Sequence, residues 1–234
     1  MKYLITGING FVGPHLANLL LGEGHEVCGM VRSSDGKEED IRDIVPDKNY
    51  SKIKFFYAEL TDFSSIERVF ANDKFDGVFH LAAQSHPPTS FVDPEGTFWA
   101  NAIGTINICK AITKYQPECR LMFCSTSEVY GAVPEEKMPI DESFPINPVN
   151  PYGVSKAAAD LHVRERVATL KLPFFVTRAF SHTGPRRGRV FSISSDAYQI
   201  IRIKKGYQEP IIKVGTLSTK RVVIDERECA MAYY

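Results

Sequence analysis

The sequence opens with MKYLITGINGFVG, residues 1–13, in which a short apolar run leads directly into three glycines spaced three apart. Tyr3–Thr6 is expected to be a buried strand, and Phe11–Leu21 has the apolar spacing of a helix. Glycines between a strand and a helix let backbone amides approach a phosphate, because a Cβ would block that approach. GxxGxxG alone is a weak motif, but its position here favours a dinucleotide site over an ordinary turn.

Strand-like and helix-like segments alternate along the rest of the chain, which predicts a doubly wound α/β fold with a parallel sheet covered on both faces. Further strands are expected at Glu26–Val31, Ile53–Ala58, Gly77–Leu81, Arg120–Ser125, Phe174–Arg178 and Ile211–Val214, giving about seven in all. Further helices are expected at Ser64–Ala71, Thr97–Lys114 and Tyr152–Leu170. The segments Ser33–Lys52 and Ala132–Pro151 are expected to be long surface loops.

The expected domain organisation is a dinucleotide-binding domain over residues 1–180 and part of a substrate-binding lobe over residues 181–234. The last residues, Cys229–Tyr234, form an apolar helical pattern without a C-cap glycine. The chain is therefore expected to be truncated. A natural short protein whose last helix frays is the alternative.

The composition is that of a soluble globular protein, with 234 residues of which 44% are hydrophobic and 24% are charged. Lys+Arg and Asp+Glu both number 28, which argues against nucleic-acid or anionic-membrane partners. No apolar run reaches the roughly 18 residues of a membrane span, and the opening run is too short for a signal peptide, so a cytoplasmic location is expected. The five cysteines are odd in number and lack a CxxC pair, which favours reduced, buried thiols over disulfides or a metal site.

The residues after the second expected strand should set the cofactor preference. An acidic residue at this point is usual for NAD, whereas here Arg32 is followed by Ser33 and Ser34. A guanidinium beside two hydroxyls suits the additional phosphate of NADP, which is therefore favoured. NAD is the alternative if Arg32 is merely solvated and Asp35 serves as the acidic residue.

Tyr152 and Lys156 lie four residues apart at the start of an expected helix, and so share one face. A neighbouring cation favours the phenolate, and such a tyrosine can exchange a proton with a substrate hydroxyl. YxxxK alone is as well explained by chance. Combined with the glycine turn and the hydroxyl-rich strand end STSEVYG, residues 125–131, it predicts a reaction centre.

Together these motifs resemble the extended short-chain dehydrogenase/reductase superfamily, with its NAD-dependent epimerase/dehydratase family, and so imply a Rossmann fold. Nearly the whole chain takes part, through GINGFVG (7–13), HLAAQSH (80–86), STSEVYG (125–131), NPYGVSK (150–156) and TRAFSHTGPRRG (177–188). Thr-Ser-Glu, Arg32 and PRRG look most like the GDP-mannose 4,6-dehydratases. Gln208–Gly215 looks equally like the GDP-4-keto-6-deoxymannose reductases, which can also carry glutamate at position 128.

The resemblance implies a catalytic group of four residues: Thr126, Glu128, Tyr152 and Lys156. In the implied cycle, Tyr152 takes the proton of the sugar C4 hydroxyl while the C4 hydride passes to the nicotinamide. Glu128 then removes the C5 proton as the C6 hydroxyl leaves as water, and the hydride returns to C6. An ordinary loop carboxylate is the alternative interpretation of Glu128.

The resemblance also implies contacts with cofactor and substrate. Cofactor contacts are expected from Gly7, Asn9, Gly10, Phe11, Val12, Gly13, Arg32, Glu59, Leu60, Leu81, Ala82, Ala83, Tyr152 and Lys156. Substrate contacts are expected from Ser85, Ser127, Ser181, Arg186, Arg187 and Arg221, and no metal site is expected. The two adjacent arginines suit a diphosphate, because guanidinium forks match its oxygens; a solvated charged loop is the alternative.

The chain departs from the family pattern at four points. Ser181 stands where asparagine is common, Glu59 replaces an aspartate, Asp225–Glu228 matches an acidic motif only in part, and the family continues well beyond this length. The expected function is an NADP-dependent nucleotide-sugar 4,6-dehydratase, a lyase acting on GDP-mannose. Alternatives are a GDP-4-keto-6-deoxymannose reductase, a nucleotide-sugar 4-epimerase, or a truncated cofactor-binding protein without turnover. The two long helices imply a homodimer or a higher homo-oligomer.

Overall fold

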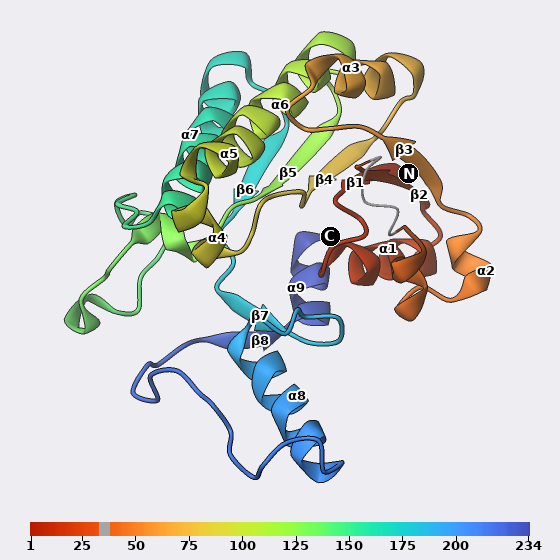
Figure 1. Ribbon diagram of the computed structural model, residues 1–234. Coiled ribbons are helices and arrows are strands. Elements are labelled where there is room, and N and C mark those ends of the chain that lie inside the picture. The colour runs from red at the N-terminus through yellow and green to blue at the C-terminus, as the bar shows by residue number, and fades with distance from the viewer. Residues whose placement is uncertain (33–37) are drawn as a thin grey trace.

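The computed structural model describes residues 1–32 and 38–234, and its centre is one parallel sheet (Figure 1). The strand order is β3-β2-β1-β4-β5-β6. The strands are β1 (Lys2–Thr6), β2 (Glu26–Val31), β3 (Lys54–Tyr57), β4 (Gly77–His80), β5 (Arg120–Cys124) and β6 (Phe174–Thr177). The order reverses between β1 and β4, and open parallel sheets bind ligands beyond the carboxyl ends of the strands at such a point. The predicted doubly wound Rossmann fold is confirmed.

Helices cover both faces of the sheet (Figure 1). One face carries α1 and α9; the other carries α3, α6 and α7. The helices are α1 (Gly13–Gly22), α2 (Asp47–Tyr50), α3 (Phe63–Asn72), α4 (Pro87–Val92), α5 (Pro94–Phe98), α6 (Gly104–Tyr115), α7 (Pro151–Leu170), α8 (Ser192–Lys204) and α9 (Glu226–Tyr233). Alternate residues of β1 enter opposite cores, with Leu4 on the α3 side and Tyr3 and Ile5 on the α1 side.

The long helix expected at Thr97–Lys114 is confirmed, with a local widening near its start. A π-helical turn, Trp99–Ile103, connects α5 to α6. Such turns often lie at functional sites, and this one holds Asn101, whose side chain is buried. Gly104 follows it, where a Cβ would lie 2.8 Å from Leu60 Cβ. The glycine therefore lets this helix approach the chain that follows β3.

Two sequence expectations about irregular segments have different outcomes. Residues 132–151 form the expected surface loop, largely exposed and containing a short 3₁₀ helix at Glu135–Lys137. The surface loop expected at Ser33–Lys52 is wrong from residue 38 onward, and residues 33–37 lie outside the described part of the chain. From residue 38 the segment forms a 3₁₀ helix, Glu38–Asp43, and then α2, and Ile41 and Val45 are fully buried in the α1-side core. Because many residues of this segment are charged, the sequence did not indicate that Ile41 and Val45 are buried.

The seventh strand expected at Ile211–Val214 is wrong. The segment is irregular and exposed, and the Lys213 amide donates to the Gln199 side chain on α8 at 2.8 Å. The backbone of this segment therefore bonds to the Gln199 side chain, where a strand would bond to a neighbouring strand. The chain instead forms a separate parallel pair, β7 (Ser181–Thr183) with β8 (Val223–Asp225).

The C-terminal part contributes to two regions. α8 and the segment after it project away from the sheet, whereas α9 packs against α1 (Figure 1). Cys229 and Tyr233 of α9 enter the α1-side core. Between the two helices, His15 Nδ1 lies 3.3 Å from Glu226 Oε1, and both side chains are buried. The domain boundary expected at residue 180 stays a prediction. By its packing, however, α9 belongs to the part of the molecule that contains the sheet.

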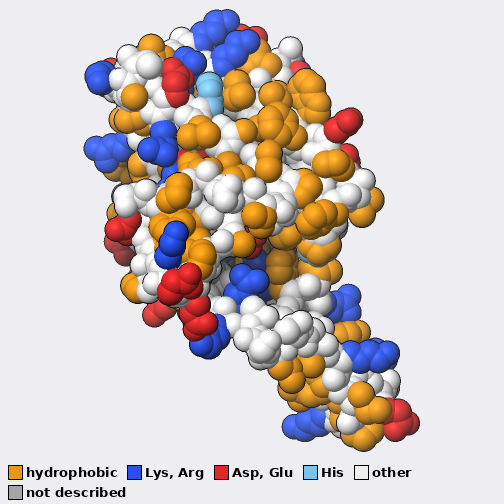
Figure 2. All heavy atoms as spheres, turned by 90° about the vertical axis from the view of Figure 1, so that its left-hand side faces the viewer, with side chains coloured by type: hydrophobic (Ala, Val, Ile, Leu, Met, Phe, Trp, Pro, Cys, Tyr) orange, Lys and Arg blue, Asp and Glu red, His pale blue; other side chains and the backbone are white. Residues whose placement is uncertain are grey.

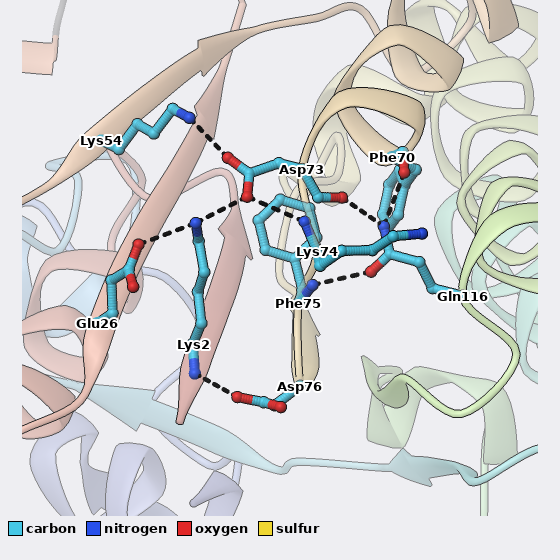
Figure 3. A network of polar contacts seen from close by, with 9 residues as sticks. All are labelled: Lys2, Glu26, Lys54, Phe70, Asp73, Lys74, Phe75, Asp76 and Gln116. Carbon is cyan, nitrogen blue, oxygen red and sulfur yellow. Dashed lines mark hydrogen bonds and ion pairs between the residues drawn. The ribbon is translucent and has the colours of Figure 1, made fainter.

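A network of polar contacts joins the amino ends of the strands (Figure 3). Asp73 accepts hydrogen bonds from Lys2 at 2.7 Å and from Lys54 at 2.6 Å. Partial burial by itself would raise the pKa of Asp73, but these two donors outweigh it and lower the pKa to about 2. The buried Gln116 accepts from the Phe75 amide and donates to the carbonyls of Phe70 and Asp73.

No helix in the described part of the chain is long and apolar enough to cross a membrane. The five cysteines are free thiols, and four of them are buried: Cys28, Cys109, Cys119 and Cys229.

Candidate active site

The glycine turn packs closely against the loop that follows β4. Gly7 has φ of 67°, and a Cβ on it would lie 2.9 Å from Ala82 Cα. The Gly10 amide donates to the Gly7 carbonyl at 2.9 Å, and α1 then begins at Gly13. A larger residue at Gly7 would be strained and would push the two loops apart. The turn therefore stands at the reversal of the sheet with a helix N-terminus directed at it, an arrangement suited to a diphosphate.

The first turns of α7 bring Tyr152 and Lys156 into the interior, where they are 9% and 3% exposed. Burial raises the pKa of Tyr152 above its ordinary value, while a hydrogen bond with Thr126 and the charge of Arg187 lower it in part. Burial likewise lowers the pKa of Lys156 to about 8. The protein by itself therefore favours the neutral form of the phenol, in contrast to the phenolate expected from the Tyr-Lys spacing.

Glu128 lies in a 3₁₀ turn, Ser127–Tyr130, that follows β5. Thr126 caps this turn, its Oγ1 accepting from the Glu128 amide at 3.2 Å. The Glu128 carboxylate accepts from Asn150 Nδ2 at 2.9 Å, and Asn150 is the N-cap of α7. The structure thus brings Thr126, Glu128, Tyr152 and Lys156 together, where the end of β5 meets the start of α7.

A chain of buried hydrogen bonds runs beneath this group, and sequence reasoning missed it. His80 contacts Thr6 Oγ1 through Nδ1 at 2.7 Å and Thr105 Oγ1 through Nε2 at 3.1 Å. Thr105 donates to the Asn101 carbonyl, and Thr6 accepts from the Ala82 amide. These partners assign the proton of His80 to Nε2. Burial and the charge of Lys156 lower the pKa of His80 to about 3, so it remains neutral beside that lysine.

The side chain of Asn101 connects the π-helical turn to the loop after β4 and to α7. It accepts from the Gln84 amide at 2.8 Å, and it donates to the Gln84 carbonyl at 2.9 Å and to Ser155 Oγ at 3.0 Å. Ser155 in turn donates to the Tyr152 carbonyl at 2.7 Å. Polar residues at the ends of apolar strands, Thr6 and His80, were the available sequence signal for this network.

The two adjacent arginines point in different directions. Arg187 lies over the rings of Phe11, at 4.8 Å, and Phe191, at 3.5 Å. Burial lowers its pKa, and the nearby Tyr152 opposes this shift. Arg186 instead pairs with Asp43 at 2.9 Å and donates to the carbonyls of Asp40 and Asn9. It fastens the segment after β7 to the glycine turn.

The other predicted contacts are spread along the carboxyl edge of the sheet and the C-terminal part. Leu60 is buried, whereas Glu59 and Arg32 are exposed; Ser33, Ser34 and Asp35 lie outside the described residues. Leu81, Ala82 and Ala83 are half-buried after β4, and Ser127 is half-buried in the turn after β5. Ser85, Ser181 and Arg221 are exposed. Among the described residues, no hydrogen bond or ion pair joins Ser181 or Arg221 to the four catalytic candidates.

The comparisons with known proteins agree with this geometry. The family model described as GDP-mannose 4,6 dehydratase matches residues 4–233. A GDP-6-deoxy-D-mannose reductase from Pseudomonas aeruginosa is 30% identical over 99% of this chain and 69% of its own length. GDP-mannose 4,6 dehydratase 2 of Arabidopsis thaliana is 34% identical over 93% of this chain and 60% of its own length.

Solved structures give the same picture. The structure of RMD from Pseudomonas aeruginosa complexed with NADPH has a TM-score of 0.83 at 29% identity, over 99% of this chain and 70% of that one. A UDP-glucose 4-epimerase from Thermus thermophilus in complex with NAD has a TM-score of 0.82 at 29% identity, over 100% of this chain and 73% of that one.

The fold and the site together are those of the Rossmann-fold enzymes of the extended short-chain dehydrogenase/reductase superfamily. Within that class, the chain belongs to the GDP-mannose 4,6 dehydratase family. It spans about 60% of the length of the dehydratases that it matches.

Proposed function

We propose that this chain carries the cofactor site and the catalytic group of an NADP-dependent GDP-mannose 4,6-dehydratase. One observation supports this choice: a carboxylate, Glu128, lies in the same half-buried turn as Thr126, next to Tyr152, although the 4-keto reductases can also carry glutamate at this position. A 4-keto reductase or a 4-epimerase has no need to remove the C5 proton. A 4,6-dehydratase does, and it needs the base beside the tyrosine that acts at C4.

The cofactor assignment rests on the glycine turn and on Arg32. The glycine turn lies in front of the N-terminus of α1, which favours a pyrophosphate, and Arg32 follows β2, where the adenosine phosphate of NADP would lie. Two similar structures are complexes with NADPH and with NAD, which supports a nicotinamide dinucleotide in either form. When bound, this group would accept a hydride from C4 of the sugar and return it to C6.

The residues of this chain would perform the proton steps. Tyr152, hydrogen-bonded with Thr126, would act as the phenolate that the positive charge of Lys156 favours, and it would become the neutral phenol on taking the C4 hydroxyl proton. Glu128 takes the C5 proton, made acidic by the new 4-ketone, and passes it to the C6 hydroxyl, which leaves as water; after the hydride reaches C6, C5 takes up a proton again. Arg187, desolvated between two aromatic rings, is placed to hold the diphosphate. The net reaction is loss of water from the sugar.

A GDP-4-keto-6-deoxymannose reductase is the second candidate. The Pseudomonas aeruginosa reductase matches 99% of this chain, and Gln208–Gly215 resembles the same enzymes. In that reaction Tyr152 would donate its proton to the C4 ketone, which suits a phenol whose pKa is raised by burial.

Product analysis separates these candidates. The chain is incubated with GDP-mannose and catalytic NADP, and separately with the 4-keto sugar and NADPH, and the products are identified by mass spectrometry. The dehydratase assignment predicts a product lighter by one water in the first reaction. Consumption of NADPH in the second reaction alone would replace it with the reductase, and cofactor binding without either product would indicate a silent binding protein.

We also propose that two copies associate through the face formed by α5, the π-helical turn and α7. Apolar side chains gather on this side of the molecule (Figure 2), and Trp99, Val154 and Leu161 are 57%, 45% and 52% exposed. A hollow of about 640 Å³ there is lined by Phe98, Trp99, Val149 and Val154 among others. Large exposed apolar patches mark interaction sites. Light scattering should give twice the chain mass, and Leu161→Glu should give monomers; a wild-type monomer at micromolar concentration would refute the dimer.

A further inference from the structure

The segment that leads into α7 is bound tightly to the turn that carries Glu128. The Asn147 amide donates to the Val129 carbonyl at 2.8 Å. Two residues into α7, a Cβ on Gly153 would lie 2.9 Å from the Glu128 carbonyl oxygen, so glycine is needed for this approach. The start of α7, with Tyr152, and the turn with Glu128 therefore form one packed unit.

Asn150 joins the two halves of this unit through its side chain. Its Oδ1 accepts from the Gly153 amide at 2.7 Å, which caps α7, and its Nδ2 donates to Glu128 Oε2 at 2.9 Å. Serine or aspartate would cap a helix equally well. Aspartate has no donor to offer, and the serine hydroxyl is too short to bridge both groups. The contact with Glu128 is therefore a property of asparagine beyond capping.

We propose that Asn150 is a positioning residue for Glu128, which orients the carboxylate toward C5 of the sugar. This inference rests on the proposed function, because it requires Glu128 to be the C5 base. The Nδ2 donor occupies Oε2 and leaves Oε1 as the oxygen that takes the proton.

Proton exchange at C5 tests the proposal without any hydride transfer. The chain, loaded with NADP, is given GDP-4-keto-6-deoxymannose in deuterated water, and deuterium entry at C5 is followed by mass spectrometry over a range of sugar concentrations. Asn150→Ser and Asn150→Asp both keep a helix cap while removing the donor. Asn147→Ser is the matched control, because Asn147 is exposed and contacts the turn through its backbone.

We expect exchange by Asn150→Ser to be roughly tenfold slower at saturating sugar, with the sugar concentration that gives half of the maximal rate unchanged. Asn150→Asp should be slower still near neutral pH, roughly a hundredfold, because a second carboxylate opposes the charge of Glu128. Asn147→Ser should match the wild type. Thermal unfolding of both Asn150 variants should stay within about 2 °C of the wild type, since the cap is retained.

Three results would overturn the proposal. One is exchange at the wild-type rate in Asn150→Ser; another is a loss that comes with weaker sugar binding and with loss of stability, which is a structural role. The third is the absence of C5 exchange in the wild type. Exchange in the wild type without dehydration of GDP-mannose would instead refute the dehydratase and leave the role of Asn150 intact.

Discussion

The same strands end in two very different polar environments. At the amino ends, Lys2, Lys54 and Asp73 form ion pairs at 2.6–2.7 Å, and the buried Gln116 has hydrogen bonds for both its oxygen and its nitrogen. At the carboxyl ends, Tyr152 and Lys156 are buried as well, yet their pKa values are shifted in the directions that oppose their charged forms. Pairing at the first end stabilises the fold. At the carboxyl ends, the charged forms of Tyr152 and Lys156 are not fully stabilised by partners, which is typical of a reaction centre.

The largest expected effect comes from removing one oxygen atom at the carboxyl end. Tyr152→Phe should lower kcat about a thousandfold, because general acid–base groups contribute about 10²–10⁴-fold. The stability of the fold should not fall, since a phenyl ring fills the same space. The control is Tyr115→Phe, which removes a surface hydrogen bond to Glu67 and should leave kcat unchanged. Equal losses in both variants would remove the functional distinction between the two regions.

A substitution at the amino end should have the opposite pattern. Gln116→Leu leaves the Phe75 amide and the carbonyls of Phe70 and Asp73 without this partner. The free energy of unfolding should fall by about 3 kcal/mol, the cost of stranding buried backbone groups. The measurement is urea unfolding, with kcat recorded at a temperature where the variant is folded. A lower kcat in the folded variant would show that the amino end also serves the chemistry.

Activity should respond to pH through Lys156. Its pKa is lowered by burial to about 8, so its positive charge is lost as the pH rises through this value. Loss of that charge disfavours the Tyr152 phenolate, and kcat should fall about tenfold per pH unit above the limb. Lys156→Arg keeps the charge at every accessible pH and should lack this alkaline limb, at a lower overall rate. If Lys156→Arg has the alkaline limb of kcat at the same pH as the wild type, the limb belongs to another group.

The smallest effect should come from the Asp73 ion pairs. The pKa of Asp73 is about 2 in the folded chain and 3.8 ordinarily, so the unfolded chain takes up the proton first. The ion pairs contribute fully to the free energy of unfolding above the ordinary pKa of Asp73. This contribution is lost as the pH falls through about 2. Screening by solvent limits it to about 1 kcal/mol. Unfolding of wild type and Asp73→Asn should differ by this amount at neutral pH and converge in acid; a constant difference would contradict the pairing.

Local motifs made one part of the structure predictable. The glycine turn, the Tyr152–Lys156 pair and the alternation of strands and helices all depend on residues close in the sequence. Contacts between distant segments could not be inferred in the same way. The bonds of His80 to Thr6 and Thr105 join residues 74 and 25 positions apart, and Asn150 reaches Glu128 across 22 positions.

The two mistaken segments show the same limit. Ile41 and Val45 are apolar residues in a charged stretch, and only the fold reveals that α1 lies beside them. The stretch Ile211–Val214 has a strand-like composition, but no strand of the described chain lies beside it to supply a ladder of hydrogen bonds. Burial and pairing depend on neighbours far away in the chain, and these decided both cases.

The role of Glu128 as the C5 base is the central claim, and one variant tests it most directly. Glu128→Gln keeps the size of the side chain and its ability to accept from Asn150 while removing the base. With GDP-mannose and NADP in deuterated water, the wild type should release a 4-keto-6-deoxy product that carries deuterium at C5. The variant should fall at least a hundredfold in this product, yet still transfer the C4 hydride. Formation of the labelled product by Glu128→Gln at the wild-type rate would contradict the account.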